Sequence, residues 1–132
     1  SFTGVKVFDG DLTEFELADT TTRTVDLTLV KGTTNTGGSI IYDPAVEVGS
    51  KTVVTAHNPT TGEKEYIEFG VIDNGTDVFH TEYGNVRTGQ QLIIPTFEIT
   101  GDNKAKINFE LGAAIGSTQS INITLTSQIT KK

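Results

Sequence analysis

Two histidines are the side chains of this sequence best suited to proton transfer or metal binding near neutral pH. His57 and His80 each stand in or at the end of a stretch with strand-like alternation, without a serine or a paired carboxylate at a spacing typical of a catalytic group. The 132 residues include no cysteine, which excludes a cysteine nucleophile, a cysteine-based metal site and a disulfide. We therefore interpret both histidines as structural or surface residues.

Oxygen-bearing side chains gather at residues 73–77, which read DNGTD. Asp73, Asn74 and Asp77 could offer ligands to a calcium ion, but their spacing does not match that of a calcium-binding loop. The same residue types are those that a tight turn requires, so a turn is the interpretation that we favour. The sequence also lacks a G-x-x-x-x-G-K-S/T phosphate-binding pattern. We expect no catalytic site, no metal and no cofactor.

Aromatic side chains could form a sugar-binding face, because aromatic rings stack on the apolar faces of sugars. The sequence has no tryptophan, and its three tyrosines, Tyr42, Tyr66 and Tyr83, fall within or next to apolar strands. Large side chains in such positions are usually buried. We therefore interpret the tyrosines as core residues.

The elements that position these side chains centre on a hairpin over residues 66–86. Asn74 and Gly75 supply the positive backbone dihedrals that a two-residue hairpin turn needs. Before the turn, alternate apolar residues share one face: Ile67, Phe69 and Val71. After the turn, Phe79 and Tyr83 share one face and His80 points to the other. The face of Phe79 and Tyr83 is the better candidate for burial.

Other segments alternate in the same way over residues 24–30, 104–111 and 121–129. Their apolar residues are expected to point inside: Val25, Leu27, Leu29, Ala105, Ile107, Phe109, Leu111, Ile121, Ile123, Leu125 and Ile129. We expect shorter strands at 40–42, 51–57, 91–94 and 96–100, a flexible loop at 31–39, and a short helical turn, if any, at 112–117. This pattern predicts an all-β fold, a single antiparallel β-sandwich of jelly-roll or immunoglobulin-like type with about eight to ten strands.

Length and charge narrow the class of protein further. A chain of 132 residues is of single-domain size, so we expect one β-sandwich domain over residues 1–132. Ten basic and seventeen acidic residues give a formal net charge of −7, which disfavours nucleic acid and anionic membranes as partners. No apolar run approaches the ~20 residues that span a bilayer.

Four short stretches together resemble a known class of domain. They are DNGT at 73–76, TEYG at 81–84, TFEI at 96–99 and the alternating strand at 104–111. The pattern resembles a domain of structural proteins of tailed bacteriophages, especially those of marine bacteria and cyanobacteria, and covers roughly residues 52–129. The hairpin residues that carry the resemblance are Asp73, Asn74, Gly75, Thr76, Thr81, Glu82, Tyr83 and Gly84.

The resemblance implies a virion component that is made in the host cytoplasm. Together with the missing catalytic arrangement, it predicts a non-enzymatic virion structural protein, foremost an accessory capsid decoration or cement protein. The alternative is a tail-fibre or baseplate domain that binds host-surface glycans. A hydrolase would require a cleft that gathers His57 or His80 with an acidic side chain. The expected partners are other virion proteins, either the major capsid protein or tail components, and further copies of the chain.

The first ten residues could provide such a contact. Phe2, Val5, Val7 and Phe8 are apolar residues of a short segment that is interrupted by glycines. An extended arm satisfies its backbone groups by pairing with the exposed edge of a neighbouring sheet. We therefore expect residues 1–10 to act as a docking arm whose deletion leaves a folded monomer that no longer joins the particle.

Overall fold

The computed structural model describes residues 4–7, 12–16 and 19–132, which contain ten β-strands. The strands are β1 (Gly4–Val7), β2 (Leu12–Glu16), β3 (Thr20–Val30), β4 (Thr36–Tyr42), β5 (Glu47–His57), β6 (Lys64–Asp73), β7 (Val78–Arg87), β8 (Ile93–Ile99), β9 (Ala105–Leu111) and β10 (Ser120–Lys131). The prediction of an all-β fold is confirmed. The part of the chain that the structure describes has no helix long and apolar enough to cross a membrane.

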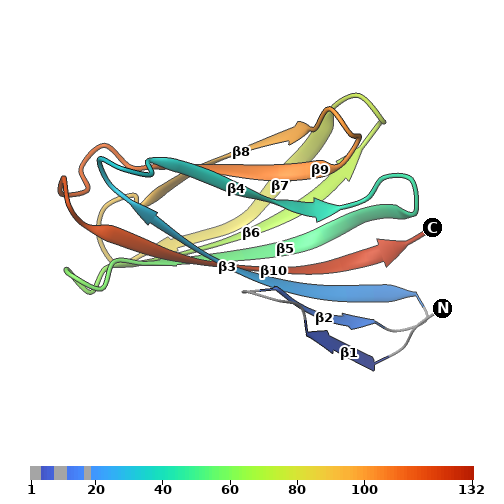
Figure 1. The fold of residues 1–132 in the computed structure, drawn as a ribbon, viewed down its shortest axis with the longest axis horizontal. Coiled ribbons are helices and arrows are strands. Elements are labelled where there is room, and N and C mark those ends of the chain that lie inside the picture. Colours follow the sequence, from blue (N-terminus) through green and yellow to red (C-terminus); the bar gives the residue numbers. More distant parts are fainter. Residues whose placement is uncertain (1–3, 8–11, 17–18) are drawn as a thin grey trace.

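The strands form two antiparallel sheets that face one another (Figure 1). The larger sheet has seven strands in the order β1-β2-β3-β10-β5-β6-β7, and the smaller has three in the order β4-β9-β8. Figure 1 shows the small sheet above the large one, with β1 and β2 at the side away from it. We call the face of the large sheet that points toward the small sheet its inner face, and the opposite one its outer face.

Alternating side chains from both sheets form the core between them. The inner face of the large sheet contributes Leu29, Val54, Ala56, Ile67, Phe69, Val71, Ile121, Ile123, Leu125 and Ile129, and the small sheet contributes Ile41, Tyr42, Ile93, Ala105, Ile107, Phe109 and Leu111. Period-two alternation places these residues on one side of each strand, which is the pattern of a sheet packed on one face. The predicted inward positions of β3, β9 and β10 are confirmed, and so is the burial of Tyr42.

Three local predictions differ from the structure. Residues 93–99 form one strand through Pro95, because β8 is an edge strand and the proline nitrogen, which has no hydrogen to donate, is tolerated where one side of the strand is unpaired. The expected loop at 31–39 is shorter, since β4 already begins at Thr36 and its glycines pack closely on neighbouring strands. Residues 112–117 turn without forming a helix.

Candidate functional site

A groove of about 460 Å³ lies on the outer face of the large sheet, where β5, β6 and β7 run side by side. We call it the outer-face groove, and its lining includes Val48, Gly49, Gly70, Ile72, Phe79, Thr81, Tyr83 and Thr130. Among the described residues that line this groove, none is Asp, Glu, Lys or Arg. The groove is therefore mainly apolar, with hydroxyl groups and His80 as its polar side chains.

Two glycines form the floor of the groove. A Cβ atom on Gly49 would collide with the carbonyl oxygen of Val71 on the neighbouring strand. A Cβ atom on Gly70 would lie 2.5 Å from the hydroxyl oxygen of Tyr83 and 3.0 Å from its Cζ, so the tyrosine ring rests directly on this glycine. The missing side chains leave a flat patch of backbone beside exposed rings.

The pairing of β6 with β7 places the rings outside. Ile72 pairs with Phe79, so both side chains point away from the core, and a bulge between Glu68 and Phe69 leaves Tyr83 without a direct partner. Phe79 and Tyr83 are 52% and 67% exposed. The predicted burial of these two residues is wrong, although they do share a face.

His80 lies on the inner side of β7 in place of the expected rings. Its imidazole stacks on Phe97 of β8, with ring centroids 4.3 Å apart and planes at 29°, and it meets the edge of Phe69 at 6.0 Å. His57 lies on the outer face, because it pairs with Lys64 in the same register that turns Tyr66 outward. The two histidines are thus on opposite faces of the sheet and do not share one cleft.

The hollowed surface continues from the outer-face groove along β6. A second hollow is lined by Ser50, Lys51, Glu68, Gly70 and Tyr83, and a third by residues that include Thr55, His57, Tyr66, Val86 and Thr88. Partial burial and a hydrogen bond to the Glu68 carboxylate raise the pKa of Tyr66 above its ordinary value. Tyr66 was expected in the core, but its ring is partly exposed on the outer face.

The hairpin tip uses its polar atoms internally. The Asp73 carboxylate accepts the backbone N–H of Gly75 at 2.8 Å and the hydroxyl of Tyr42 at 2.7 Å. The Asn74 side-chain oxygen accepts the N–H groups of Thr76 and Asp77 at 3.0 and 2.8 Å. The connection is a four-residue loop, 74–77, in which Gly75 has a positive φ and Asn74 does not, so the predicted two-residue turn is wrong.

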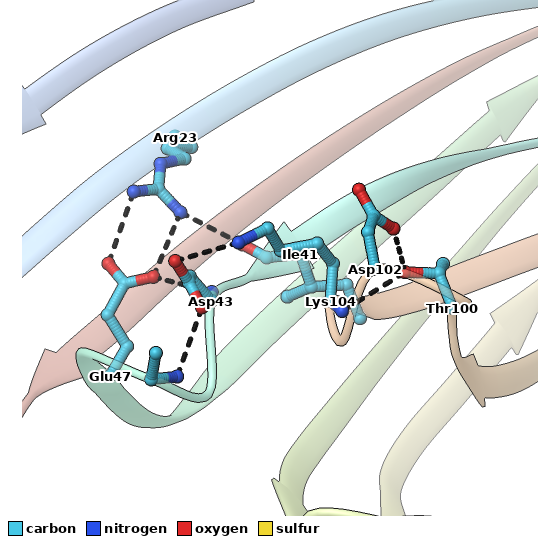
Figure 2. Close-up of polar contacts among 8 residues, drawn as sticks. Arg23, Ile41, Asp43, Glu47, Thr100, Asp102 and Lys104 are labelled. Atoms are coloured by element: carbon cyan, nitrogen blue, oxygen red, sulfur yellow. Dashed lines mark hydrogen bonds and ion pairs between the residues drawn. The ribbon is translucent and has the colours of Figure 1, made fainter.

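A cluster of charged side chains closes one end of the sandwich (Figure 2). Arg23 of β3 contacts the buried carboxylate of Glu47 at 3.1 Å, and Lys104 contacts Asp43 at 2.9 Å. The Lys104 ammonium and the N–H of Ala45 hold the pKa of Asp43 below its usual value. These contacts tie β3, the β4–β5 turn and the start of β9 together.

Hydrogen bonds of the Thr100 hydroxyl link Asp102 and Lys104 in the same region. Thr100 donates its hydroxyl to Asp102 at 2.6 Å and accepts the N–H of Lys104 (Figure 2). The hydroxyl of Thr100 lowers the pKa of Asp102. A lowered pKa keeps a carboxyl ionised near neutral pH, so Asp43 and Asp102 act here as ion-pair and hydrogen-bond acceptors. Within the described residues, no group of three or more His, Asp and Glu is arranged to hold a metal ion.

The remaining predicted site residues divide between β7 and the beginning of the chain. Thr81, Glu82 and Gly84 lie in β7 around the bulge at Tyr83. Val5 and Val7 lie in β1, which pairs with β2 of the same chain. Phe2 and Phe8 are outside the described residues.

Sequence reasoning missed Val48, Gly49, Gly70 and Ile72. A signal was present, because residues 66–72 read YIEFGVI, with apolar residues at both parities of the strand. A strand in a sheet covered on one side only should be apolar at one parity. Apolar residues at both parities therefore indicate an exposed apolar surface.

Comparison with protein-family models finds no match for the chain, and a search of curated proteins finds none either. Two solved structures that resemble it are tailspike proteins. The tailspike of Acinetobacter phage vB_ApiP_P1 shares 14% identity over 81% of this chain and 22% of that protein, with a TM-score of 0.45. Tailspike gp49 of Acinetobacter baumannii bacteriophage Fri1, a capsular polysaccharide depolymerase, shares 13% identity over 92% of this chain and 21% of that protein, with a TM-score of 0.54.

The chain spans about a fifth of each tailspike, and at this identity the likeness shows a shared fold alone. It nevertheless contradicts the prediction that the protein is not an enzyme, because the Fri1 protein with this fold is described as a depolymerase. That prediction rested on the absence of a catalytic arrangement from the sequence. Because the chain matches only about a fifth of a tailspike that is described as a depolymerase, the absence of a catalytic arrangement from the chain is not evidence against an enzyme.

Proposed function

We propose that this chain is a domain of a bacteriophage tail protein, of the tail-spike or tail-fibre kind, that binds glycans of the host surface in the outer-face groove. The observation that carries the proposal is the groove itself, with Phe79 and Tyr83 exposed beside a glycine floor. The fold that the chain shares with a phage tailspike supports the tail assignment over capsid decoration. The phage resemblance of the hairpin sequence is consistent with a virion protein and does not distinguish tail from capsid.

The chemistry of the groove suits a sugar ring. One face of a sugar presents C–H groups, which pack against aromatic rings, while the ring edge presents hydroxyls that need hydrogen-bond partners. Phe79 and Tyr83 offer such rings, and Thr81 and Thr130 offer hydroxyls at the border. Ligand sites commonly combine an apolar surface with a few polar groups that fix orientation.

The proposed assembly follows from the assignment to a phage tail protein. The chain forms a single domain over residues 1–132 that joins other tail components and further copies of itself. Residues 1–10 are proposed as one of these contacts, with Val5 and Val7 in the edge strand β1. An edge strand presents unpaired backbone groups that a neighbouring chain can use.

A glycan array that includes bacterial capsular polysaccharides tests the proposal. We expect the chain to bind a subset of them, and Phe79→Ala and Tyr83→Ala each to weaken that binding at least about tenfold, which corresponds to about 1.4 kcal/mol. The matched control is Ile94→Ala, an exposed apolar residue of the small sheet, which should bind like the parent chain. Binding to no polysaccharide, or binding that both groove variants retain, would contradict the proposal.

A further inference from the structure

We infer that the site is a track along β6 and β7 that takes an extended, uncharged stretch of polysaccharide several sugars long, and not a single terminal sugar. This inference rests on the proposed function and specifies its ligand. It starts from the three hollows that follow one another on the outer face. The first two share Gly70 and Tyr83. Glu68 of the second and Tyr66 of the third are two residues apart on the same strand and face.

The length of the track follows from strand geometry. Ile72 lines the first hollow and Lys64 lines the third, and both belong to β6. At about 3.3 Å per residue, the eight steps between them span about 26 Å. This is far longer than one sugar ring, so a single sugar would leave most of the track empty.

Apolar side chains recur along the track. Phe79, Tyr83 and Val86 follow one another on the outer side of β7 and are 52%, 67% and 65% exposed. Tyr66 pairs with Val86 and adds a ring at the far end. A polymer whose sugars repeat the same apolar face would meet such a contact at each of the three places. Isolated exposed apolar residues are ordinary, but a row of them beside hollows marks a binding surface.

The charges favour an uncharged polymer. The first hollow has no Asp, Glu, Lys or Arg in its described lining. In the second hollow, Lys51 Nζ lies 3.4 Å from Glu68 Oε1, so the two charges offset one another. The third hollow is lined by one Lys and one Glu, Lys64 and Glu65, so it too has no excess of either sign among these residue types. The chain as a whole has a net charge of −7, which repels an acidic polysaccharide. Hydroxyls along the way, from Thr130, Thr81 and Thr55, can bond to sugar hydroxyls.

Binding of graded fragments tests the inference. The probes are the mono-, di-, tetra- and octasaccharides of a neutral capsular polysaccharide that the chain binds on the array, measured by calorimetry. We expect affinity to rise at least about tenfold from disaccharide to octasaccharide, and hyaluronan fragments of equal length to bind more weakly. Val86→Ser should weaken the octasaccharide several-fold and leave the disaccharide unchanged, while Phe79→Ala should weaken both. Val86 is exposed, so its substitution should hardly affect folding.

Four other outcomes would contradict either the extended track or the proposed function. If the polymer binds but its affinity does not depend on length, or Val86→Ser has no effect on the octasaccharide, the extended track is wrong while the proposed function stands. Equal or tighter binding of hyaluronan would overturn the preference for uncharged sugars. If sedimentation shows self-association that Val86→Ser abolishes, this face is an interface between copies and the track is wrong. If nothing on the array binds, the proposed function fails first.

Discussion

At the scale of single residues, the proposed site depends on its glycines as much as on its aromatic side chains. Gly70 lets the Tyr83 ring approach the sheet closely, because a Cβ at this position would lie 2.5 Å from the tyrosine hydroxyl oxygen. The nearby Tyr83 atoms belong to the far end of an exposed side chain that can swing away. A substitution at Gly70 should therefore change the surface more than the fold.

We expect Gly70→Ala to reduce polysaccharide binding about tenfold while the free energy of unfolding changes by less than about 1 kcal/mol. Fluorescence-monitored binding and urea unfolding measure the two effects separately. Gly101→Ala is the control, because Gly101 lies in the turn between β8 and β9, away from the track, and a Cβ there meets nothing within 4 Å. Unaltered binding by Gly70→Ala would show that the position of the Tyr83 ring is unimportant.

At the scale of elements, one buried carboxylate holds three segments together. Glu65 of β6 is fully buried and accepts Arg87 Nε of β7 at 2.8 Å. It also accepts the N–H groups of Leu92 and Ile93, at 2.9 and 3.3 Å, where β8 begins. Since β6 and β7 form the proposed track, Glu65 fixes the track from its inner side.

We expect Glu65→Ala to lower the free energy of unfolding by about 3–5 kcal/mol, because it leaves Arg87 and two backbone donors without their acceptor. Glu65→Gln keeps an acceptor and should cost less. The control is Glu68→Ala on the same strand, whose partly exposed pair with Lys51 should be worth less than about 1 kcal/mol. Equal losses for Glu65→Ala and Glu68→Ala in urea unfolding would contradict the role assigned to Glu65.

The elements also show how far the sequence predicts the structure. In β3, β9 and β10, one parity is apolar and the other polar, so alternation alone identifies the buried face. In β7, aromatic rings occur on both sides of the strand, with Phe79 and Tyr83 on one side and His80 on the other. The alternation of side chains therefore does not identify the buried face. That choice depends on the register with β6 and on the bulge before Tyr83, both of which are set by tertiary pairing.

The proposed site was missed for the same reason. The groove needs Val48 and Gly49 of β5, Gly70 of β6 and Tyr83 of β7 to meet on one face, and nothing local in the sequence gives the order β5-β6-β7 together with its register. The sequence does contain the excess of apolar residues in 66–72 that makes an exposed surface expected. It does not tell which neighbouring strands and residues complete that surface.

At the scale of the whole molecule, the charged cluster at one end of the sandwich makes stability depend on pH. The contacts of Asp43 with Lys104 and of Asp102 with Thr100 lower the pKa of both carboxyls below the ordinary value of 3.8. A lowered pKa in the folded state means that the unfolded chain binds more protons as the solution turns acid. The stabilisation is therefore complete above about pH 4 and is lost as the pH falls through the folded-state values.

We expect the urea midpoint to fall as the pH drops from about 4 to about 2, and Asp43→Asn to show a smaller fall. Lys104→Gln should flatten the dependence in a similar way, because it removes the other partner of the same pair, and the double variant should add little. A fall of equal size in the parent chain and in Asp43→Asn would show that this pair does not contribute to the acid sensitivity.

The whole molecule thus combines a packed sandwich with one exposed, ring-bearing face near the β7 edge. NMR titration of the isotope-labelled chain with the octasaccharide of a bound neutral capsular polysaccharide tests this account most directly. The account predicts that the shifted backbone amides cluster on residues 48–51, 64–72 and 79–88, along the outer face of β5, β6 and β7. Shifts that cluster instead on the small sheet or at the charged end around Asp43 and Lys104 would contradict it.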